Sequence, residues 1–433
     1  MSTPQWGPNW SALEEIDPEI AGIVLSERDR LNGGLQLIAS ENFTSPAVLA
    51  VLGSTLSNKY AEGYPGNRFY QGCEFVDAAE RLAVDRAKEL FGANHVNVQP
   101  HSGASANLAV YAAFAQPDDP VLALSLPHGG HLTHGARINF SGAWFTAVPY
   151  SVNRDTEMID YDEVRELARL HQPRIIVCGA TSYSREMDYA IFREIADEID
   201  AILWVDAAHI MGLVAGQAIP SPVPYADVVT TTTHKTLRGP RGGMILCRTE
   251  HAAAIDRAVF PFSQSGPMMH TIAAKAVALQ EAATPDFRTY AHSVVENARA
   301  LSTALEGHGM RPISGGTDTH LVVCDVSALG TDGADAETRC AQANILLNKN
   351  AIPFDPLPPR TPSGIRVGTA ALTTQGFGRD DMSVVADLIA AAVTAGKPGE
   401  RVDVSLAEIA RQVSEFVADK PAYAVEGIQS LQG

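Results

Sequence analysis

The stretch that decides the fold lies in the middle of the chain, where residues 230–243 read TTTTHKTLRGPRGG. It places one lysine, Lys235, between a run of threonines and a Gly-rich turn. Upstream, the short apolar run Ala201–Val205 ends at an acid, Asp206, and continues with Ala207-Ala208-His209. The sequence therefore predicts an apolar strand that delivers a carboxylate at its C-terminal end, followed by a lysine in a turn.

This order of acid and lysine suits an enzyme that holds pyridoxal phosphate. The lysine amine can form a Schiff base with the cofactor, and a buried carboxylate keeps the pyridine nitrogen protonated so that the ring accepts electrons. Either residue alone is more often a helix-capping aspartate or a solvated lysine. The pair, together with the segments described below, favours the cofactor interpretation.

Composition sets the limits of the interpretation. The 433 residues are 45% apolar and 19% charged, which predicts two domains, or one large α/β domain with an appendage. A net charge of −18 argues against a nucleic acid or an anionic membrane as the main partner, although local amides can still bind a phosphate. No apolar run approaches the length of a membrane helix, and Met1–Asn9 lacks the features of an export signal.

Cysteine usage points to a reducing compartment. The five cysteines are odd in number, far apart and without metal-ligand spacing. We therefore expect a cytoplasmic protein.

Short apolar runs alternate with amphipathic stretches between residues 36 and 285, which is typical of strands buried on both faces of a mostly parallel sheet. The predicted strands are Pro120–Leu124, Arg174–Cys178, Ala201–Val205, Val228–Thr231 and Gly243–Cys247. The predicted helices are Asp17–Arg30, Tyr161–Leu170, Ala190–Ile199, Phe287–Gly307, Ala336–Ala343, Asp380–Ala395 and Ser405–Val417, with a further strand at His320–Val326. We expect an N-terminal arm (1–35), a large domain (36–285) and a small C-terminal α/β domain (286–433), with a short linker at Lys397-Pro398-Gly399.

Two segments could serve a phosphate and a ring. Residues 99–107, QPHSGASAN, precede a helical run, and small residues at a helix N-terminus let backbone amides meet a phosphate, although an ordinary helix cap has the same pattern. Residues 128–134, HGGHLTH, space three histidines by three. Such spacing on a helix could bind a metal, but the paired glycines argue against a regular helix and no carboxylate or thiolate completes the set nearby, so we expect no metal. A histidine stacked on a cofactor and an ordinary turn remain the alternatives.

Two further segments carry candidate charges. Residues 58–70, NKYAEGYPGNRFY, place Glu62 between tyrosines in a Gly/Pro-rich loop, and a buried Glu62 could transfer protons near neutrality. Arg366, in the segment Ser363–Thr369, could hold a substrate carboxylate through a bidentate fork. A solvated Glu and a surface Arg are the simpler alternatives.

Taken together, these segments resemble serine hydroxymethyltransferase almost from end to end. The motifs KYAEGYPG, HGGHLTHG, TTTTHKTLRGPRGG and NKNxxPF recur in that order, from LIASEN at Leu37 through GIR at Gly364. The resemblance implies fold type I of the pyridoxal-phosphate enzymes: a large domain with a mostly parallel seven-stranded sheet, a small C-terminal domain, and active sites shared across a homodimer or tetramer interface. It implies interconversion of L-serine and glycine, with tetrahydrofolate as the one-carbon acceptor.

The resemblance also implies residue roles. Lys235 carries pyridoxal 5'-phosphate, Asp206 pairs with the pyridine nitrogen and His131 stacks on the ring. The catalytic residues it implies are Lys235, Glu62, Asp206, His131, Tyr70 and His234. The cofactor-binding residues it implies in one subunit are Ser102, Gly103, Ala104, Thr181, Asp206, His209, His234 and Lys235, joined by Tyr60, Ser265 and Gly266 from the other subunit.

Substrate and folate contacts follow from the same resemblance. The amino-acid substrate would meet Ser40, Tyr70 and Arg366, and the folate would meet Leu126, Leu132, Phe69 and Asn350.

Departures from the family pattern lie near these groups. Ala207 stands where the family usually has methionine, Phe69 where it has tyrosine, and Gln375 where it has arginine. Thr181-Ser182 and Ser265-Gly266 replace Ser-Ala and Gly-Gly. These changes leave an alternative open, a specialised relative that acts on α-methylserine or another β-hydroxy amino acid. A catalytically silent relative is less well supported, because Lys235, Asp206, His131, Glu62 and Arg366 are all present. A transaminase lacks support, because the lysine context HKTLRG at residues 234–239 belongs to the hydroxymethyltransferase pattern.

Overall fold

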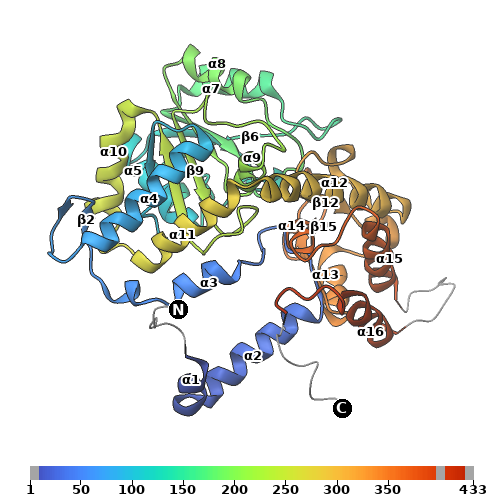
Figure 1. The fold of residues 1–433 in the computed structure, drawn as a ribbon. Coiled ribbons are helices and arrows are strands. Elements are labelled where there is room, and N and C mark those ends of the chain that lie inside the picture. Colours follow the sequence, from blue (N-terminus) through green and yellow to red (C-terminus); the bar gives the residue numbers. More distant parts are fainter. Residues whose placement is uncertain (1–8, 396–404, 425–433) are drawn as a thin grey trace.

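A seven-stranded sheet forms the centre of the molecule in the computed structural model, which describes residues 9–395 and 405–424 (Figure 1). Its strands are β4 (His95–Asn97), β5 (Pro120–Leu124), β6 (Thr146–Tyr150), β7 (Ile175–Gly179), β8 (Ile202–Asp206), β9 (Val228–Thr232) and β10 (Gly243–Cys247). The order across the sheet is β4-β10-β9-β8-β7-β5-β6. Neighbours from β9 to β6 pair in parallel, and β10 pairs antiparallel with both β9 and β4.

Both faces of the sheet are buried over its inner strands, and alternate residues of these strands enter different cores. Leu122 and Ile176 belong to the larger core, whereas Val121 and Ile175 belong to the core on the opposite face. Side chains of a strand point alternately to the two faces, so a strand covered on both sides must be apolar throughout. That is why these strands read as continuous apolar runs.

Helices cover both faces. The helices that contribute to the larger core are α4 (Glu74–Phe91), α7 (Tyr161–His171), α8 (Tyr189–Glu198), α9 (Met211–Ala215), α11 (Met269–Ala282) and α12 (Pro285–Gly307). The helices that contribute to the opposite core are α5 (Gly103–Phe114) and α10 (Ala252–Arg257).

A second sheet lies beyond the long helix α12, which runs from the large sheet toward it (Figure 1). Its order is β11-β12-β15-β14, and every neighbouring pair is antiparallel. The elements around it are β11 (Arg311–Pro312), β12 (Leu321–Asp325), β14 (Asn348–Asn350), β15 (Gly364–Gly368), α13 (Gly333–Gln342), α14 (Ala370–Thr374), α15 (Asp381–Thr394) and α16 (Leu406–Val417). The short strand β1 (Leu35–Gln36) pairs in parallel with β13 (Ile345–Leu346), and Leu35 and Leu37 pack into the core of this second unit.

The N-terminal helices extend away from the two sheets (Figure 1). They are α1 (Trp10–Ile16) and α2 (Pro18–Asn32), joined at Asp17. Helix α2 buries only Ala21, while Ile20, Ile23 and Val24 are exposed. Exposed apolar side chains on a helix that contacts so little of its own chain form a surface without cover in the monomer. None of the helices in the described ranges has both the length and the apolar character needed to cross a membrane.

The predicted α/β class with a mostly parallel sheet is confirmed. Five of the seven strands lie within one residue of their predicted bounds. The edge strands β4 and β6 were not predicted from the sequence, and neither was the antiparallel direction of β10. The predicted linker Lys397-Pro398-Gly399 lies outside the described residues.

Candidate active site

Asp206 lies at the last position of β8, at the carboxyl edge of the sheet. It is 9% exposed, and its Oδ2 lies 2.8 Å from Asn107 Nδ2 and 3.0 Å from His134 Nε2. Burial alone would raise the pKa of Asp206, but the hydrogen bond and charge of His134, with contributions from His131 and Asn107, lower it well below its ordinary value. The carboxylate is therefore held in its ionised form.

Lys235 follows β9 in a tight turn whose backbone is fixed from several sides. Its carbonyl oxygen accepts a hydrogen bond from Asn42 Nδ2 at 2.9 Å, and the carbonyl of Thr236 accepts one from the Tyr290 hydroxyl at 3.1 Å. Burial lowers the pKa of Lys235 to about 8; the Asp206 carboxylate opposes that fall, and nearby arginines add to it. A lysine with this pKa has far more free amine at neutral pH than an ordinary one, which suits a nucleophile.

The N-terminus of α5 offers free backbone amides. Ser102 caps the helix, and its Oγ accepts the amide of Ser105 at 3.1 Å. The amides of Gly103 and Ala104 have no partner among the residues that the structure describes. At Gly103 a Cβ would lie 2.7 Å from Thr232 Cγ2, so a glycine lets the helix start close against β9. Free amides at a helix N-terminus are a suitable site for an anion.

His131 reaches the same edge from the loop after β5. The loop needs its glycines, because a Cβ at Gly130 would lie 2.0 Å from the carbonyl oxygen of Leu124. His131 Nδ1 lies 2.7 Å from Thr133 Oγ1, and burial lowers the pKa of the ring to about 4. The imidazole is therefore neutral at neutral pH.

The donor atoms of His131, His134 and Asp206 also lie within 4.8 Å of one another, a grouping that could hold a metal. The hydrogen bonds of Asp206 to His134 and of His131 to Thr133 account for this grouping without an ion.

Arg366 comes to the site from β15 of the second sheet. Its Nε donates to Asn348 Oδ1 at 3.0 Å and its Nη1 to the carbonyl of Thr181 at 2.7 Å. Burial lowers the pKa of Arg366 to about 10, which still leaves it charged at neutral pH. The remaining N–H groups of the guanidinium are available to a carboxylate.

Two stacked histidines connect the second sheet to the site. The rings of His209 and His320 lie 5.4 Å apart, and His209 Nδ1 is 3.2 Å from His320 Nε2. His320 Nε2 is in turn 3.1 Å from the carbonyl oxygen of Ala39, the neighbour of the half-buried Ser40. The C-terminal unit therefore carries Arg366 to the edge of the large sheet, and its His320 contacts the backbone beside Ser40.

A second group of predicted site residues gathers elsewhere on the surface. Tyr60 and Tyr70 meet edge to face with ring centres 5.6 Å apart, and they are 55% and 47% exposed. The Ser265 hydroxyl donates to the Glu62 carboxylate and lies 3.4 Å from the Tyr60 hydroxyl. The Glu62 charge raises the pKa of Tyr70. Together with Gly266, which packs against the Tyr60 ring, these residues form what we call the Glu62 cluster.

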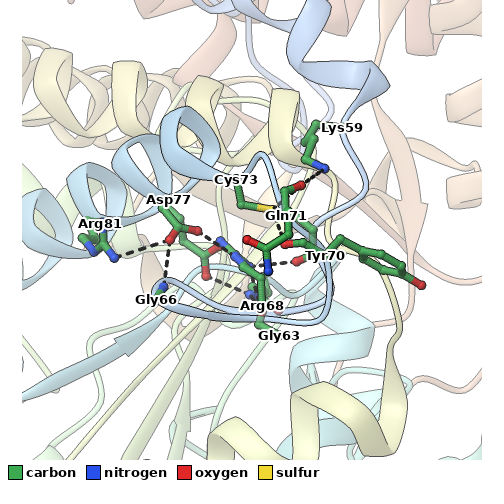
Figure 2. Close-up of polar contacts among 12 residues, drawn as sticks. Lys59, Gly63, Gly66, Arg68, Tyr70, Gln71, Cys73, Asp77 and Arg81 are labelled. Carbon is green, nitrogen blue, oxygen red and sulfur yellow. Dashed lines mark hydrogen bonds and ion pairs between the residues drawn. The ribbon is translucent and has the colours of Figure 1, made fainter.

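A buried arginine supports this exposed cluster (Figure 2). Arg68 Nη1 donates to the carbonyls of Ala61 and Gly63, both at 2.8 Å, and these residues flank Glu62. The other guanidinium nitrogens pair with Asp77 at 2.8 Å and Glu80 at 2.6 Å. The backbone on both sides of Glu62 is therefore fixed by a buried side chain, while the Glu62 carboxylate accepts from Ser265.

The residues expected at the folate fall into two groups, one near His131 and Arg366 and one beside the Glu62 cluster. Leu126 and Leu132 are 46% and 44% exposed in the loop that carries His131, and Asn350 ends β14, the strand whose Asn348 contacts Arg366. Phe69 is 71% exposed and packs on Phe260 at 5.6 Å, beside the Glu62 cluster.

The arrangement at the sheet edge fits pyridoxal phosphate. Two buried nitrogens, His209 Nε2 and His234 Nδ1, have no partner among the described residues, and the amides of Gly103 and Ala104 are free. A ligand with a phosphate at one end and a polar ring at the other meets these groups, with Asp206 and Lys235 in place for the ring. The fold and this site define a pyridoxal-phosphate-dependent enzyme of fold type I.

Comparison with known proteins identifies the family. The family profile described as serine hydroxymethyltransferase matches residues 13–389. A serine hydroxymethyltransferase of Acidobacterium capsulatum is 55% identical over 413 residues, which cover 95% of this chain and 96% of that protein. The serine hydroxymethyltransferase of Koribacter versatilis matches with the same identity and coverage. The chain belongs to the serine hydroxymethyltransferase family.

The structure adds partners that the sequence analysis did not assign. Asn107 and His134 hold Asp206, Thr133 holds His131, and Asn348 holds Arg366. Asn107 had a readable signal, because it is a buried amide in an otherwise apolar helix and so needs a partner. The partner itself, 99 positions away in the chain, follows only from the fold.

Proposed function

We propose that this protein interconverts L-serine and glycine, passing the one-carbon unit to and from tetrahydrofolate with pyridoxal phosphate as cofactor. The observation that carries the proposal is the meeting of Asp206, Lys235 and Arg366 at one edge of the sheet in a member of this family. When bound, the cofactor accepts the electrons left on the amino acid when its Cα–Cβ bond breaks.

The chain's own residues bind and orient the cofactor in this proposal. Lys235 holds it covalently, and the ionised Asp206, fixed by Asn107 and His134, faces the pyridine nitrogen. The amides of Gly103 and Ala104, with Ser102, hold the phosphate. The remaining contacts are assigned to the ring-stacking His131 and to Thr181, His209 and His234.

Arg366 orients the amino acid. Its contacts to Asn348 and Thr181 fix the guanidinium plane and leave donors free for the substrate carboxylate, with Ser40 beside it. A bidentate contact would set which bond of the substrate lies across the cofactor ring. The folate would occupy the exposed apolar rim formed by Leu126 and Leu132, near Asn350.

A second copy of the chain supplies proton transfer. The Glu62 cluster is exposed in the monomer, and we assign Glu62 and Tyr70 to the active site of the partner subunit, with Tyr60, Ser265, Gly266 and Phe69. The uncovered apolar side of α2 supports the same homodimer, or a tetramer built from it.

The division of the chain into an arm (1–35), a cofactor domain (36–285) and a C-terminal domain (286–433) belongs to the same proposal. We also place the protein in the cytoplasm, because its five cysteines are all buried free thiols.

The experiment that tests the function is product analysis. Purified protein is incubated with L-serine, α-methyl-L-serine or L-threonine, each with and without tetrahydrofolate. We expect glycine from L-serine, at a rate that rises strongly with tetrahydrofolate. The relatives do not favour the α-methylserine alternative. Serine turnover near zero beside fast turnover of α-methylserine would reverse the assignment.

A further inference from the structure

Lys275 is a buried lysine that the proposed reaction does not use. It lies in the middle of α11 and is 1% exposed. Its Nζ donates to three backbone carbonyls: Val98 at 2.7 Å, Pro100 at 3.1 Å and Gly243 at 2.7 Å. Three acceptors match the three N–H groups of an ammonium, and a neutral amine would leave one carbonyl without a donor.

Those carbonyls belong to the backbone that presents the anion site. Val98 and Pro100 lie between β4 and Ser102, the cap of α5. Gly243 opens β10, and its amide donates to the Pro100 carbonyl at 3.0 Å. A Cβ at Gly243 would lie 2.2 Å from the Ser102 carbonyl oxygen, so the two segments are in direct contact. The ammonium thus fixes both sides of the turn from which Ser102, Gly103 and Ala104 emerge.

The same ammonium also reaches the turn that carries Lys235. A Cβ at Gly242 would lie 2.5 Å from Lys275 Cε, and the Gly242 carbonyl accepts the Thr233 amide at 3.1 Å. Thr233 precedes His234 and Lys235. One side chain therefore connects, through two glycines, the backbone at both ends of the cofactor site.

We propose that Lys275 is a positioning residue for the phosphate end of the cofactor site, acting through residues 98–103 rather than by contact with the ligand. The inference rests on the proposed function, in which the amides of Gly103 and Ala104 hold the phosphate.

A ligand pair isolates the phosphate end. Pyridoxal lacks the phosphate of pyridoxal phosphate but keeps the aldehyde and the ring. The affinity of the full chain, freed of cofactor, is measured for both, and the ratio of the two dissociation constants is compared between variants. A general loss of stability weakens both ligands and leaves the ratio unchanged, whereas a displaced anion cradle weakens pyridoxal phosphate alone.

The main variant is Lys275→Met, which keeps length but removes the charge and the donors. We expect pyridoxal phosphate to bind on the order of tenfold to a hundredfold more weakly, with pyridoxal affected little. Lys275→Gln retains two N–H groups, so the preference for pyridoxal phosphate over pyridoxal should fall less in this variant. It serves as the second test if Lys275→Met folds poorly. Arg86→Met is the matched control. Arg86, in α4, donates to the carbonyl of Ala276, the neighbour of Lys275 in α11. This variant should leave the ratio of the two dissociation constants as in the wild type.

Two possible results would separate failure of the proposed phosphate site from failure of the proposed role of Lys275. A wild-type chain that binds pyridoxal as tightly as pyridoxal phosphate refutes the phosphate cradle, and with it part of the proposed function. A wild-type preference for the phosphate that persists unchanged in folded Lys275→Met and Lys275→Gln refutes the role of Lys275 while leaving the function intact.

Discussion

The site around Asp206 and the Glu62 cluster are built in opposite ways. Asp206 is 9% exposed and its oxygens are held by groups of the same chain, whereas Tyr60 and Tyr70 are about half exposed and contact mainly one another. Both sets come from motifs that identify the family. The difference is one of burial: the Asp206 group has its polar partners within the chain, whereas the Glu62 cluster presents its tyrosines to solvent in the monomer, which is why we propose that a second copy of the chain covers it.

The exposed cluster is nevertheless not loosely held. Arg68 lies buried beneath it and fixes the carbonyls on both sides of Glu62 (Figure 2). Gln99 extends this support: its side chain donates to Gly63 O and to Glu80, and its backbone carbonyl accepts from Gln264 Nε2, next to Ser265 of the cluster. A rigid base under exposed functional groups is what a shared site requires, because the partner can use the groups only if they arrive in a fixed position.

The largest effect should come from the buried region. Lys235→Ala should abolish turnover and leave no cofactor that borohydride can fix to the chain, because Lys235 supplies the amine of the proposed site. Mass spectrometry after reduction measures the attachment, with Lys88→Ala as a control. Cofactor still fixed to the Lys235 variant would show that the buried region is not the attachment site.

A mixing experiment tests whether the two regions work in different copies. Glu62→Gln chains and Lys235→Ala chains should each be nearly inactive alone. In a random mixture half of the dimers are mixed, and one of the two sites in each mixed dimer has both wild-type groups, so about a quarter of wild-type activity should return. Differently tagged chains verify that subunits have exchanged. If exchange is complete and activity stays at the level of the parents, Glu62 acts within its own chain.

The third prediction concerns the base of the exposed cluster. Arg68→Met leaves Asp77 and Glu80 without their buried partner, so the free energy of unfolding should fall by about 3–5 kcal/mol. Arg81→Met removes a pair to the same Asp77, but Arg81 is mostly exposed and the loss should stay below about 1 kcal/mol. Urea denaturation compares the two variants. Equal losses would mean that burial of Arg68 contributes nothing special to the cluster.

The sequence predicted the buried strands well because burial on both faces leaves a continuous apolar run. It missed β6 because that edge strand exposes Thr146, Ala147 and Pro149, and β4 because three residues with a histidine and an asparagine resemble a loop. The reversed direction of β10 was also beyond it, since strand composition does not encode direction.

At the site, the residues with distinctive motifs could be named from the sequence, and their supports could not. Asn107 and Lys275 lie in helices whose local sequence says nothing of Asp206 or of Pro100. Their contacts arise when the fold brings distant segments together. The role of each named residue remains a prediction that the experiments here address.

The fourth prediction uses the pH dependence of cofactor capture to distinguish a buried lysine from an exposed one. The pKa of Lys235 is lowered to about 8. As the pH rises toward 8, the fraction of free amine therefore increases about tenfold for each pH unit, and above pH 8 it levels off. The rate at which the cofactor-free chain captures pyridoxal phosphate should follow this curve in stopped-flow absorbance. An amine in an exposed region, with an ordinary pKa near 10.5, would continue to gain rate through pH 10, and that result would contradict the effect of burial.

The smallest effect belongs to the rim of the exposed region. Phe69 stands where the family usually has tyrosine, and it is 71% exposed beside Phe260. If a partner's folate covers this ring, Phe69→Tyr adds one hydrogen bond worth about 1 kcal/mol, so tetrahydrofolate should bind roughly fivefold more tightly. The stability of the folded monomer should change little, because an exposed hydroxyl is already hydrated. Thermal unfolding without folate serves as the control. Titration of tetrahydrofolate in the presence of glycine measures the change. An unchanged folate affinity would place Phe69 outside the folate site and confine the exposed region to proton transfer.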